Sequence, residues 1–561
     1  ANCSDWKKSP SDCSCDNERK ERNVAMLKLK KHKTELPQTA SGIPKPSPEE
    51  SAVVYAQRLG EWFSARRPRE YKKKFGQFFT SADIAQFMAS LTVPVGSEIR
   101  ILDPGAGCGI LSCAVCEQII RNPHHIKIIR LDLYETDPDL SLLLDKCMSH
   151  MSRILNRHSI TLDYHIHTSD YILEHADALC SGSLLFNDAI AAYDVCISNP
   201  PYFKLSKSDR RAVAALSVIY GQPNIYALFM AVSAALLKKG GQLVFITPRS
   251  FASGFYFKRF RDYFFSLIRP ELIHLFDSRR DGFKKDGVLQ EMIILKGTRS
   301  DLWRQQKRQA AIQISVSYSP DDLKQAQTSV YDVNLLLDTR SGMNILRLPK
   351  NRDEERIVER VLTWPGSFGK YNLHISTGPV VAFRSRDFLL YGDTQPNEAV
   401  PLLWLHHIRS MKIQWPIHTL KKPQWLQLCN EAAKFCVRNQ NLVLVRRFSA
   451  KEEERRLVAA PYLKSLLPVS HLGLENHLNY IYKREGTLTP QEAAGLAVLL
   501  NSKHLDTYFR VINGNTQVGA TEISLIPLPP LETIIQAGQI ALEAGFDGCN
   551  VEAIATLFFE Q

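Results

Sequence analysis

Residues 100–109 have the sequence Arg-Ile-Leu-Asp-Pro-Gly-Ala-Gly-Cys-Gly. The apolar start predicts a buried strand, and the glycines after Asp103 predict a tight loop that opens a helix. Glycines in such a loop let the backbone approach a bound ligand closely. This stretch therefore predicts a strand, a ligand-binding loop and a helix, the first unit of a doubly wound α/β fold.

The sequence around this stretch repeats the same alternation. Short apolar runs at residues 126–134, 194–198 and 242–247 predict further strands. Between them lie segments with apolar residues at helical spacing, of which 225–237 is the clearest. We therefore expect a Rossmann-like α/β domain whose ligand lies at the carboxyl ends of the strands.

The composition limits the class of protein. A chain of 561 residues with 44% hydrophobic content exceeds one hydrophobic core, so two folded domains are expected. The formal net charge of +12 suits a polyanionic partner, because clustered Lys and Arg displace counterions from phosphates. The apolar runs are too short to cross a bilayer, so we expect a cytoplasmic protein with no membrane role.

The cysteines predict no bound metal. There are 12 of them, without the paired spacing of a zinc site, which is typical of reduced thiols in the cytosol. Residues 1–50, which include Cys3, Cys13 and Cys15, hold few large apolar residues and predict a flexible tail or linker.

Four further segments follow the tail in the predicted domain organisation. The alternating pattern predicts an α/β domain, and after a connecting segment the sequence changes to mixed short strands with aromatic residues and basic pairs, which predict a second, α+β domain. A helix is expected at the carboxyl end. The predicted boundaries are 51–300 for the α/β domain, 301–360 for the connection, 361–535 for the second domain and 536–561 for the helix.

An acidic residue follows the second predicted strand. Glu135 lies at its end, where a carboxylate can accept hydrogen bonds from both ribose hydroxyls of a nucleoside. A dinucleotide is the obvious competitor for such a site. However, Asp103 at the head of the glycine loop would repel a pyrophosphate and suits the ammonium group of S-adenosylmethionine. The two acids therefore favour a methyl donor.

Two other positions have both a structural and a functional interpretation. Asp170 can accept a hydrogen bond from an adenine amino group while Tyr171 packs on the ring, but a cap for the following turn explains Asp170 equally well. Thr80 can cap the helix that begins near Ile84, and this explains it completely. Its functional alternative is a place over the methionine end of the cofactor.

The strongest signal is Asn199-Pro-Pro-Tyr202, directly after a predicted strand. The successive prolines can neither continue the strand nor start a helix, so they hold a rigid extended loop. The side-chain oxygen of Asn199 and the carbonyl of Pro200 can then accept both hydrogens of one amino group. This localises the nitrogen lone pair and aims it at a methyl donor, so that transfer needs positioning rather than a strong base.

Together these motifs resemble the gamma-class (Taq-type, Eco57I-like) DNA adenine-N6 methyltransferases of type II restriction-modification systems. The resemblance covers residues 70–535, with the cofactor motifs, the catalytic loop and a C-terminal target-recognition domain in the family's order. It implies transfer of a methyl group from S-adenosyl-L-methionine to adenine N6 in double-stranded DNA by base flipping. The implied partners are DNA and a cognate restriction endonuclease, and we expect a monomer.

The resemblance also implies roles for single residues. Phe78 and Thr80 would contact the methionine part of the cofactor, and Glu135 would hold the ribose. The remaining cofactor contacts would be Asp103, Gly105, Gly107, Thr136, Asp170 and Tyr171. Asn199, Pro200, Pro201 and Tyr202 would form the loop that holds the flipped target. Phe283 would stack on its other side, although a packed loop aromatic is an equally good interpretation.

The second domain offers candidate DNA contacts. Arg446 and Arg447 follow the predicted strand 441–445, which suits contacts to phosphate or guanine, although surface solubility explains most such pairs. Residues 451–456 carry both charges and predict a solvated helix. Residues 499–502 and 514–517 resemble the closing part of the family's recognition domain.

Other substrates remain open from the residues alone. Cytosine N4, adenine N6 in RNA and the side-chain amide of glutamine all offer a planar amino group to the same two acceptors. The long basic second domain disfavours a protein substrate. The choice of adenine in DNA follows from the resemblance.

Overall fold

The computed structural model describes residues 42–68, 70–71, 76, 79–122, 125–180, 191–221, 223–278, 291–301, 303, 305, 310–338, 341–392, 396, 398–449, 453–514 and 517–560. The chain divides into two compact units, Ala1–Ser47 and Pro48–Gln561, and the labelled helices and strands belong to the second. Among the described residues, no helix is both long and apolar enough to span a bilayer.

A nine-stranded sheet organises the first part of this unit, in the order β3-β2-β1-β4-β5-β7-β6-β8-β9. Strands β3, β2, β1, β4 and β5 are mutually parallel, and β7 runs antiparallel to both neighbours. The strands are β1 (Glu98–Pro104), β2 (Ile128–Tyr134), β3 (Thr161–His167), β4 (Tyr193–Ser198), β5 (Leu237–Pro248), β6 (Ile268–Phe276), β7 (Met292–Arg299), β8 (Ala311–Ser317) and β9 (Gln327–Asp332).

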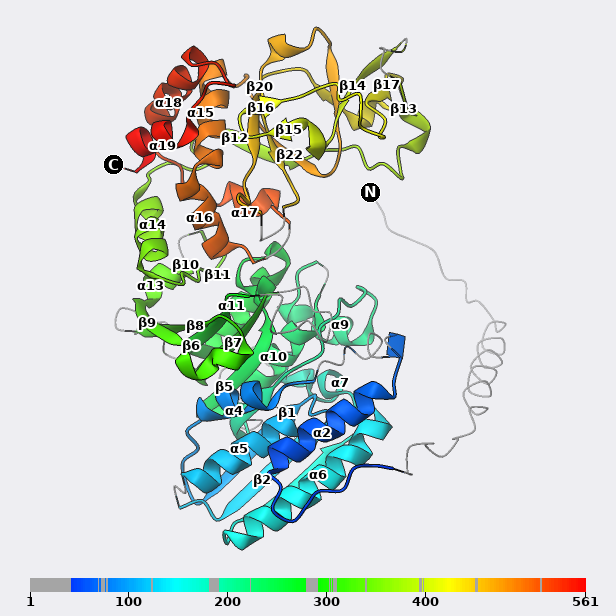
Figure 1. The fold of residues 1–561 in the computed structure, drawn as a ribbon, viewed down its shortest axis with the longest axis vertical. Coiled ribbons are helices and arrows are strands. Elements are labelled where there is room, and N and C mark those ends of the chain that lie inside the picture. Colours follow the sequence, from blue (N-terminus) through cyan, green and yellow to red (C-terminus); the bar gives the residue numbers. More distant parts are fainter. Residues whose placement is uncertain are drawn as a thin grey trace, which may run out of the picture. The chain divides into compact units, whose positions relative to one another are not determined.

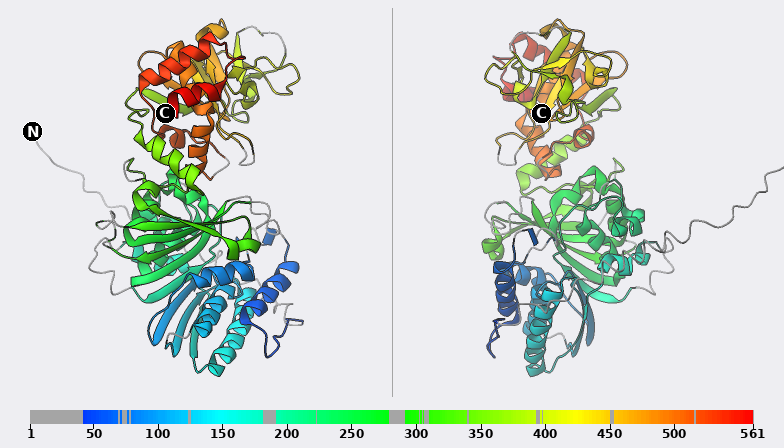
Figure 2. Two further views of the ribbon diagram at one scale, coloured as in Figure 1. Left: turned by 60° about the vertical axis from the view of Figure 1, so that its left-hand side comes forward. Right: turned by 90° about the vertical axis from the view of Figure 1, so that its right-hand side faces the viewer.

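Helices pack around this sheet (Figures 1 and 2). One group packs through α5, and a second group packs around α10, whose residues are all buried. The first group is α2 (Ala52–Ala65), α4 (Ala82–Ser90), α5 (Ile110–Arg121) and α6 (Pro138–Arg157). The second is α7 (Tyr171–His175), α8 (Asp177–Cys180), α10 (Ile225–Leu236) and α11 (Lys258–Leu267), and α9 (Arg210–Ala214) contacts α7.

The order of the strands locates the ligand site. The chain passes from β3 at one edge back to β4 beside β1, so the connections leave β1 and β4 in opposite directions. Ligands of open α/β sheets bind in the crevice outside the carboxyl ends of strands at such a switch point. This places Asp103 and Asn199, at the ends of β1 and β4, beside the same crevice.

The second part of the unit combines two small sheets with helices. The sheets have the orders β12-β22-β19-β20 and β13-β17-β14-β21-β18. Their strands are β12 (Leu373–Thr377), β13 (Leu389–Leu390), β14 (Ala399–Leu403), β17 (Trp425–Gln427), β18 (Cys436–Arg438), β19 (Leu442–Arg446), β20 (Ala459–Tyr462), β21 (His471–Leu474) and β22 (Leu478–Lys483). Two short ladders pair β10 (Leu337–Asp338) with β11 (Ile345–Leu346) and β15 (Ile408–Arg409) with β16 (Lys412–Ile413).

Helices accompany these sheets on one side (Figure 1). They are α14 (Arg352–Thr363), α15 (Pro490–Asn501), α16 (Lys503–Ile512), α17 (Ala520–Ser524), α18 (Leu531–Glu543) and α19 (Val551–Phe559). The short helix α13 (Val333–Leu336) lies beside the large sheet, where it contacts β8 and β9. Helix α15 packs against β20 and α18 and is buried over most of its length, so it forms the centre of this part.

The predicted α/β class and its strands are confirmed. Two predicted boundaries differ from the elements observed. The large sheet continues to Asp332, past residue 300, because β8 pairs with β6 and β9 pairs with β8. Two helices, α18 and α19, form the carboxyl end, where one helix over 536–561 was expected.

Candidate active site

The glycine loop joins the end of β1 to α5. The amides of Gly105 and Ala106 both donate to the carbonyl of Tyr134 at 2.9 Å, which ties the loop to β2. Gly109 has a φ of 81° and lies at the N-cap of α5. A Cβ built there would lie 2.7 Å from side chains of Leu144 and Met148, so glycine lets α5 approach α6.

Asp103 is fully buried at the end of β1. One carboxylate oxygen accepts a hydrogen bond from the Ser112 hydroxyl at 2.6 Å. The other, Oδ1, is buried with no hydrogen-bond partner among the described residues. Burial raises the pKa of the Asp103 carboxyl to about 7. A buried carboxylate oxygen without a partner fits a cationic ligand group, such as the ammonium predicted from the sequence.

Glu135 connects the end of β2 to the glycine loop. Its carboxylate accepts hydrogen bonds from the amides of Gly107 at 3.0 Å and Asp137 at 2.8 Å. Burial raises the pKa of this carboxyl to about 7. Thr136, the next residue, is exposed. The carboxylate therefore lies directly beside the loop, as an acceptor for ribose hydroxyls requires.

The structure gives Asp170 the capping role. Its carboxylate accepts from the amides of Ile172 and Leu173 at 3.1 Å, at the N-terminus of α7. Tyr171 is buried, and its hydroxyl forms a hydrogen bond with Ser233 Oγ at 2.9 Å. Its ring packs against Phe229, with 5.1 Å between ring centroids. A contact of Asp170 or Tyr171 with adenine stays a prediction.

The loop that begins at Asn199 lies next to the glycine loop. Ser198 donates from its hydroxyl to the carbonyl of Pro104 at 2.6 Å, which joins the ends of β4 and β1. A Cβ built on Gly105 would lie 3.8 Å from Pro201 Cδ and 3.9 Å from the Asn199 carbonyl oxygen. The structure therefore brings together the two loops that the sequence marks as ligand loop and catalytic loop.

Two side chains among the described residues contact the Asn199 carboxamide. Its Nδ2 donates to Thr80 Oγ1 at 2.9 Å, and its Oδ1 contacts the hydroxyl of Tyr202. The Tyr202 hydroxyl also donates to the carbonyl of Ile246 at 2.9 Å. The carboxamide oxygen of Asn199 therefore contacts the Tyr202 hydroxyl, and a hydrogen-bond donor of a ligand can take the place of this hydroxyl.

Thr80 does not cap the following helix, so that interpretation is wrong. Helix α4 begins at Ala82, and its N-cap is Ser81, whose hydroxyl accepts from the amide of Ile84. Thr80 is buried beside Asn199 instead. Phe78 and Phe283 lie outside the described residues.

The two predicted DNA-binding arginines are partly buried. Nε and Nη2 of Arg446 both donate to the carbonyl of Ile408. Nη1 of Arg447 donates to the carbonyl of Asn476 at 2.9 Å. The predicted solvated helix over 451–456 is wrong in its described part: residues 453–456 are not helical, and Arg456 is 1% exposed.

Sequence reasoning missed three cations directly after the catalytic loop. Lys204, Lys207 and Arg210 are exposed, and none forms an ion pair with another described residue. Arg211, by contrast, pairs with Asp209 at 2.8 Å. The sequence could have indicated them, because these basic residues follow Tyr202 within a few positions.

The fold and the loops define the class: a Rossmann-like methyltransferase. A family model described as Eco57I restriction-modification methylase matches residues 120–283. The chain is 32% identical over 470 residues to the type II methyltransferase M.PstI of Providencia stuartii, covering 82% of this chain and 88% of the relative. It is 30% identical over 474 residues to M.BsuBI of Bacillus subtilis, covering 84% and 91%.

The chain therefore belongs to the type II restriction-modification methyltransferases. The solved structure of the type IIG restriction endonuclease BpuSI is similar with a TM-score of 0.39 at 13% identity, covering 91% of this chain and 66% of that one. S-adenosyl-L-methionine is the cofactor that this family implies. Asp103, with a buried oxygen that has no partner among the described residues, and Glu135, beside the glycine loop, fit its ammonium and ribose groups.

Proposed function

We propose that the protein is a site-specific DNA methyltransferase that acts on adenine N6 in duplex DNA, as the modification enzyme of a type II restriction-modification system. The observation that carries the proposal is the Asn199 carboxamide, at the end of β4 and next to the glycine loop. The matching family model, described as a restriction-modification methylase, supports the restriction-modification role, and we propose a cognate endonuclease as partner.

The chain's own groups would prepare the target nitrogen. Asn199 Oδ1 and the Pro200 carbonyl accept the two amino hydrogens, so the lone pair is withdrawn from the ring and directed at the donor. Bound S-adenosyl-L-methionine supplies an electrophilic sulfonium methyl group. On transfer to the nitrogen that Asn199 and Pro200 hold, the electron pair of the broken C–S bond would stay on the donor sulfur, and the excess amino proton would leave to water. Positioning supplies most of the rate enhancement.

The cofactor would be held by the residues around the switch point. Asp103 would pair with the ammonium group, Glu135 would accept from the ribose hydroxyls, and Gly105 and Gly107 would allow close approach. We retain Phe78, Thr136, Asp170 and Tyr171 as proposed cofactor contacts and Phe283 as a proposed stacking partner of the target.

An amino group paired inside a duplex must leave the helix before it can reach Asn199. We propose that the second part of the chain, residues 361–535, recognises the target sequence. The exposed cations Lys204, Lys207 and Arg210 would contact phosphates beside the flipped nucleotide, because they follow the catalytic loop directly.

The test is to incubate the protein with radiolabelled S-adenosyl-L-methionine and unmethylated duplex DNA, RNA or protein, and to identify the modified unit. We expect label as N6-methyladenine in DNA at one sequence context. Label as N4-methylcytosine, or in RNA or protein alone, would reject the proposed substrate. Asn199→Asp, which keeps an oxygen but loses the Nδ2 donor, serves as an activity control.

A further inference from the structure

The catalytic use of Asn199 depends on which way its carboxamide faces. Its oxygen must point to the target amino group. In the opposite orientation the Asn199 NH2 would face that amino group, and two N–H donors cannot form a hydrogen bond with each other. The oxygen and nitrogen of a carboxamide are nearly equal in size, so packing alone does not distinguish the two orientations. A hydrogen-bond partner on the nitrogen side is needed.

Thr80 lies at the nitrogen side. Its Oγ1 is 2.9 Å from Asn199 Nδ2, and its side chain is 8% exposed, so little water competes for this bond. The neighbouring Ser81 already caps α4, which means that the Thr80 hydroxyl is not needed to begin the helix. The bond joins residues 119 positions apart in the chain.

We propose that Thr80 is a positioning residue for methyl transfer: its hydroxyl oxygen accepts from Asn199 Nδ2 and thereby keeps Asn199 Oδ1 directed at the target amino group. This inference rests on the proposed function. It differs from the cofactor contact that the family resemblance implies for Thr80, because it acts on the amide of the catalytic loop.

The arrangement around Oδ1 suits this role. The Tyr202 hydroxyl contacts Oδ1 and also donates to the carbonyl of Ile246. When an amino group takes the place at Oδ1, the Tyr202 hydroxyl retains its bond to Ile246. The Thr80 bond lies on the other side of the amide and stays in place, so it holds the orientation during the reaction.

The test compares Thr80→Val, which keeps the shape but removes the acceptor, with Thr80→Ser, which keeps the acceptor. We expect kcat at saturating cofactor to fall about 10- to 100-fold in Thr80→Val, the range of one charge-free catalytic hydrogen bond. Thr80→Ser should stay within about threefold of wild type. Cofactor affinity, measured by calorimetry without DNA, should change by less than about threefold in both variants.

Ser81→Ala is the matched control, because it removes the adjacent hydroxyl and the helix cap but no contact to Asn199. It should lower thermal stability while kcat stays near wild type. A Thr80→Val enzyme with wild-type kcat, or a Thr80→Ser enzyme as slow as Thr80→Val, overturns the inference. So does a loss confined to cofactor affinity, which would make Thr80 a cofactor contact alone.

The assay uses whichever nucleic acid accepts label from the wild-type protein. Label in RNA rather than DNA would therefore reject the proposed substrate, while the comparison of Thr80→Val with Thr80→Ser on that RNA would still decide the role of Thr80. The two failures are thus distinguishable.

Discussion

The protein contains two asparagines beside a serine at the end of a buried element, and their surroundings differ. Asn199 follows β4, and its amide contacts the side chains of Thr80 and Tyr202. Asn501 ends α15 with no exposed surface, and its amide bonds mainly to backbone: it accepts from Ala459 N at 3.0 Å and donates to the carbonyls of Ala459 and Ala497 at 2.7 Å. Its Nδ2 also lies 3.6 Å from Met411 Sδ.

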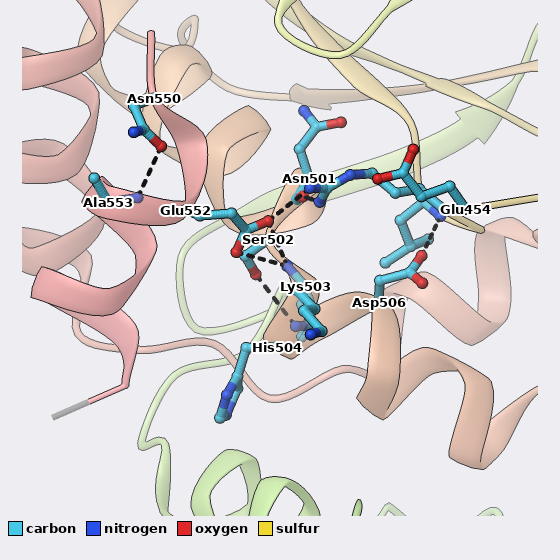
Figure 3. Close-up of polar contacts among 12 residues, drawn as sticks. Glu454, Asn501, Ser502, Lys503, His504, Asp506, Asn550, Glu552 and Ala553 are labelled. Carbon is cyan, nitrogen blue, oxygen red and sulfur yellow. Dashed lines mark hydrogen bonds and ion pairs between the residues drawn. The ribbon is translucent and has the colours of Figure 1, made fainter.

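The polar groups around Asn501 connect helices with one another and with the strand region beside them (Figure 3). Glu552 of α19 accepts from the amide of Lys503 and pairs with Arg455 at 2.7 Å. Asp506 accepts from the amides of Arg456 and Leu457 and pairs with Arg510. These bonds join groups of the protein to one another, whereas we propose that the groups at the ends of β1 and β4 bind the cofactor and the target.

The largest expected effect separates activity from stability at Asn199. In Asn199→Ala, methyl transfer should fall about 10³-fold, because one of the two acceptors for the target amino group is removed. Cofactor affinity and the free energy of unfolding should stay near wild type, since Asn199 itself is half-buried and the bonds that disappear are to two side chains. Single-turnover transfer, calorimetric titration and urea unfolding measure the three quantities. Wild-type transfer rates in this variant would contradict the catalytic role.

The opposite result is expected at Asn501. Asn501→Ala leaves the buried amide of Ala459 without its partner and removes a donor from the carbonyls of Ala459 and Ala497, so the free energy of unfolding should fall by about 3 kcal/mol. Asn550→Ala is the control in the same network: it removes one cap bond to Ala553 at the start of α19 and should cost about 1 kcal/mol. An Asn501→Ala protein of wild-type stability that no longer transfers methyl groups would make this asparagine part of the active site.

These two asparagines also show what the sequence could and could not predict. The strand before Asn199 and the prolines after it predicted the catalytic loop, because local chemistry allows little else. Residues 499–502 also resembled part of the family's recognition domain, yet their bonds depend on β20 and α19, which are distant in sequence. Arg456 is similar: its charge predicted solvent, but tertiary contacts bury it.

The two acids of the proposed cofactor site should make binding depend on pH. Burial raises the pKa of the Asp103 and Glu135 carboxyls to about 7, so in the cofactor-free protein both are substantially protonated below that pH. A cofactor that needs them ionised must displace these protons, so its affinity should fall as pH decreases through about 7, by up to tenfold per pH unit for each carboxyl. Calorimetric titration between pH 5.5 and 8.5 measures this.

Glu135→Gln should bind the cofactor more weakly at pH 8. The pH dependence of its cofactor affinity should also be less steep, because one of the two titrating carboxyls is absent. The same carboxyls should make the cofactor-free wild type less stable as pH rises toward 7, because their pKa values in the folded state exceed the ordinary values. The melting temperature of Glu135→Gln should therefore decline less than that of wild type between about pH 5 and pH 7. Equal pH dependence of affinity in both proteins would exclude Glu135 from cofactor binding.

The smallest effect distinguishes cations available to DNA from cations engaged inside the protein. Replacing Lys204 and Lys207 with alanine should reduce the slope of log K against log salt for DNA binding by about 1.8, or about 0.9 for each phosphate that the variant no longer neutralises. The control replaces Lys127 and Lys146, which are exposed near β2 and on α6, and should leave the slope unchanged. Replacing Arg446 and Arg447 should lower stability, because their guanidiniums donate to backbone carbonyls. If the arginine variant instead reduced the salt slope at unchanged stability, these residues would face the DNA, and the distinction between engaged and available groups would fail in this region.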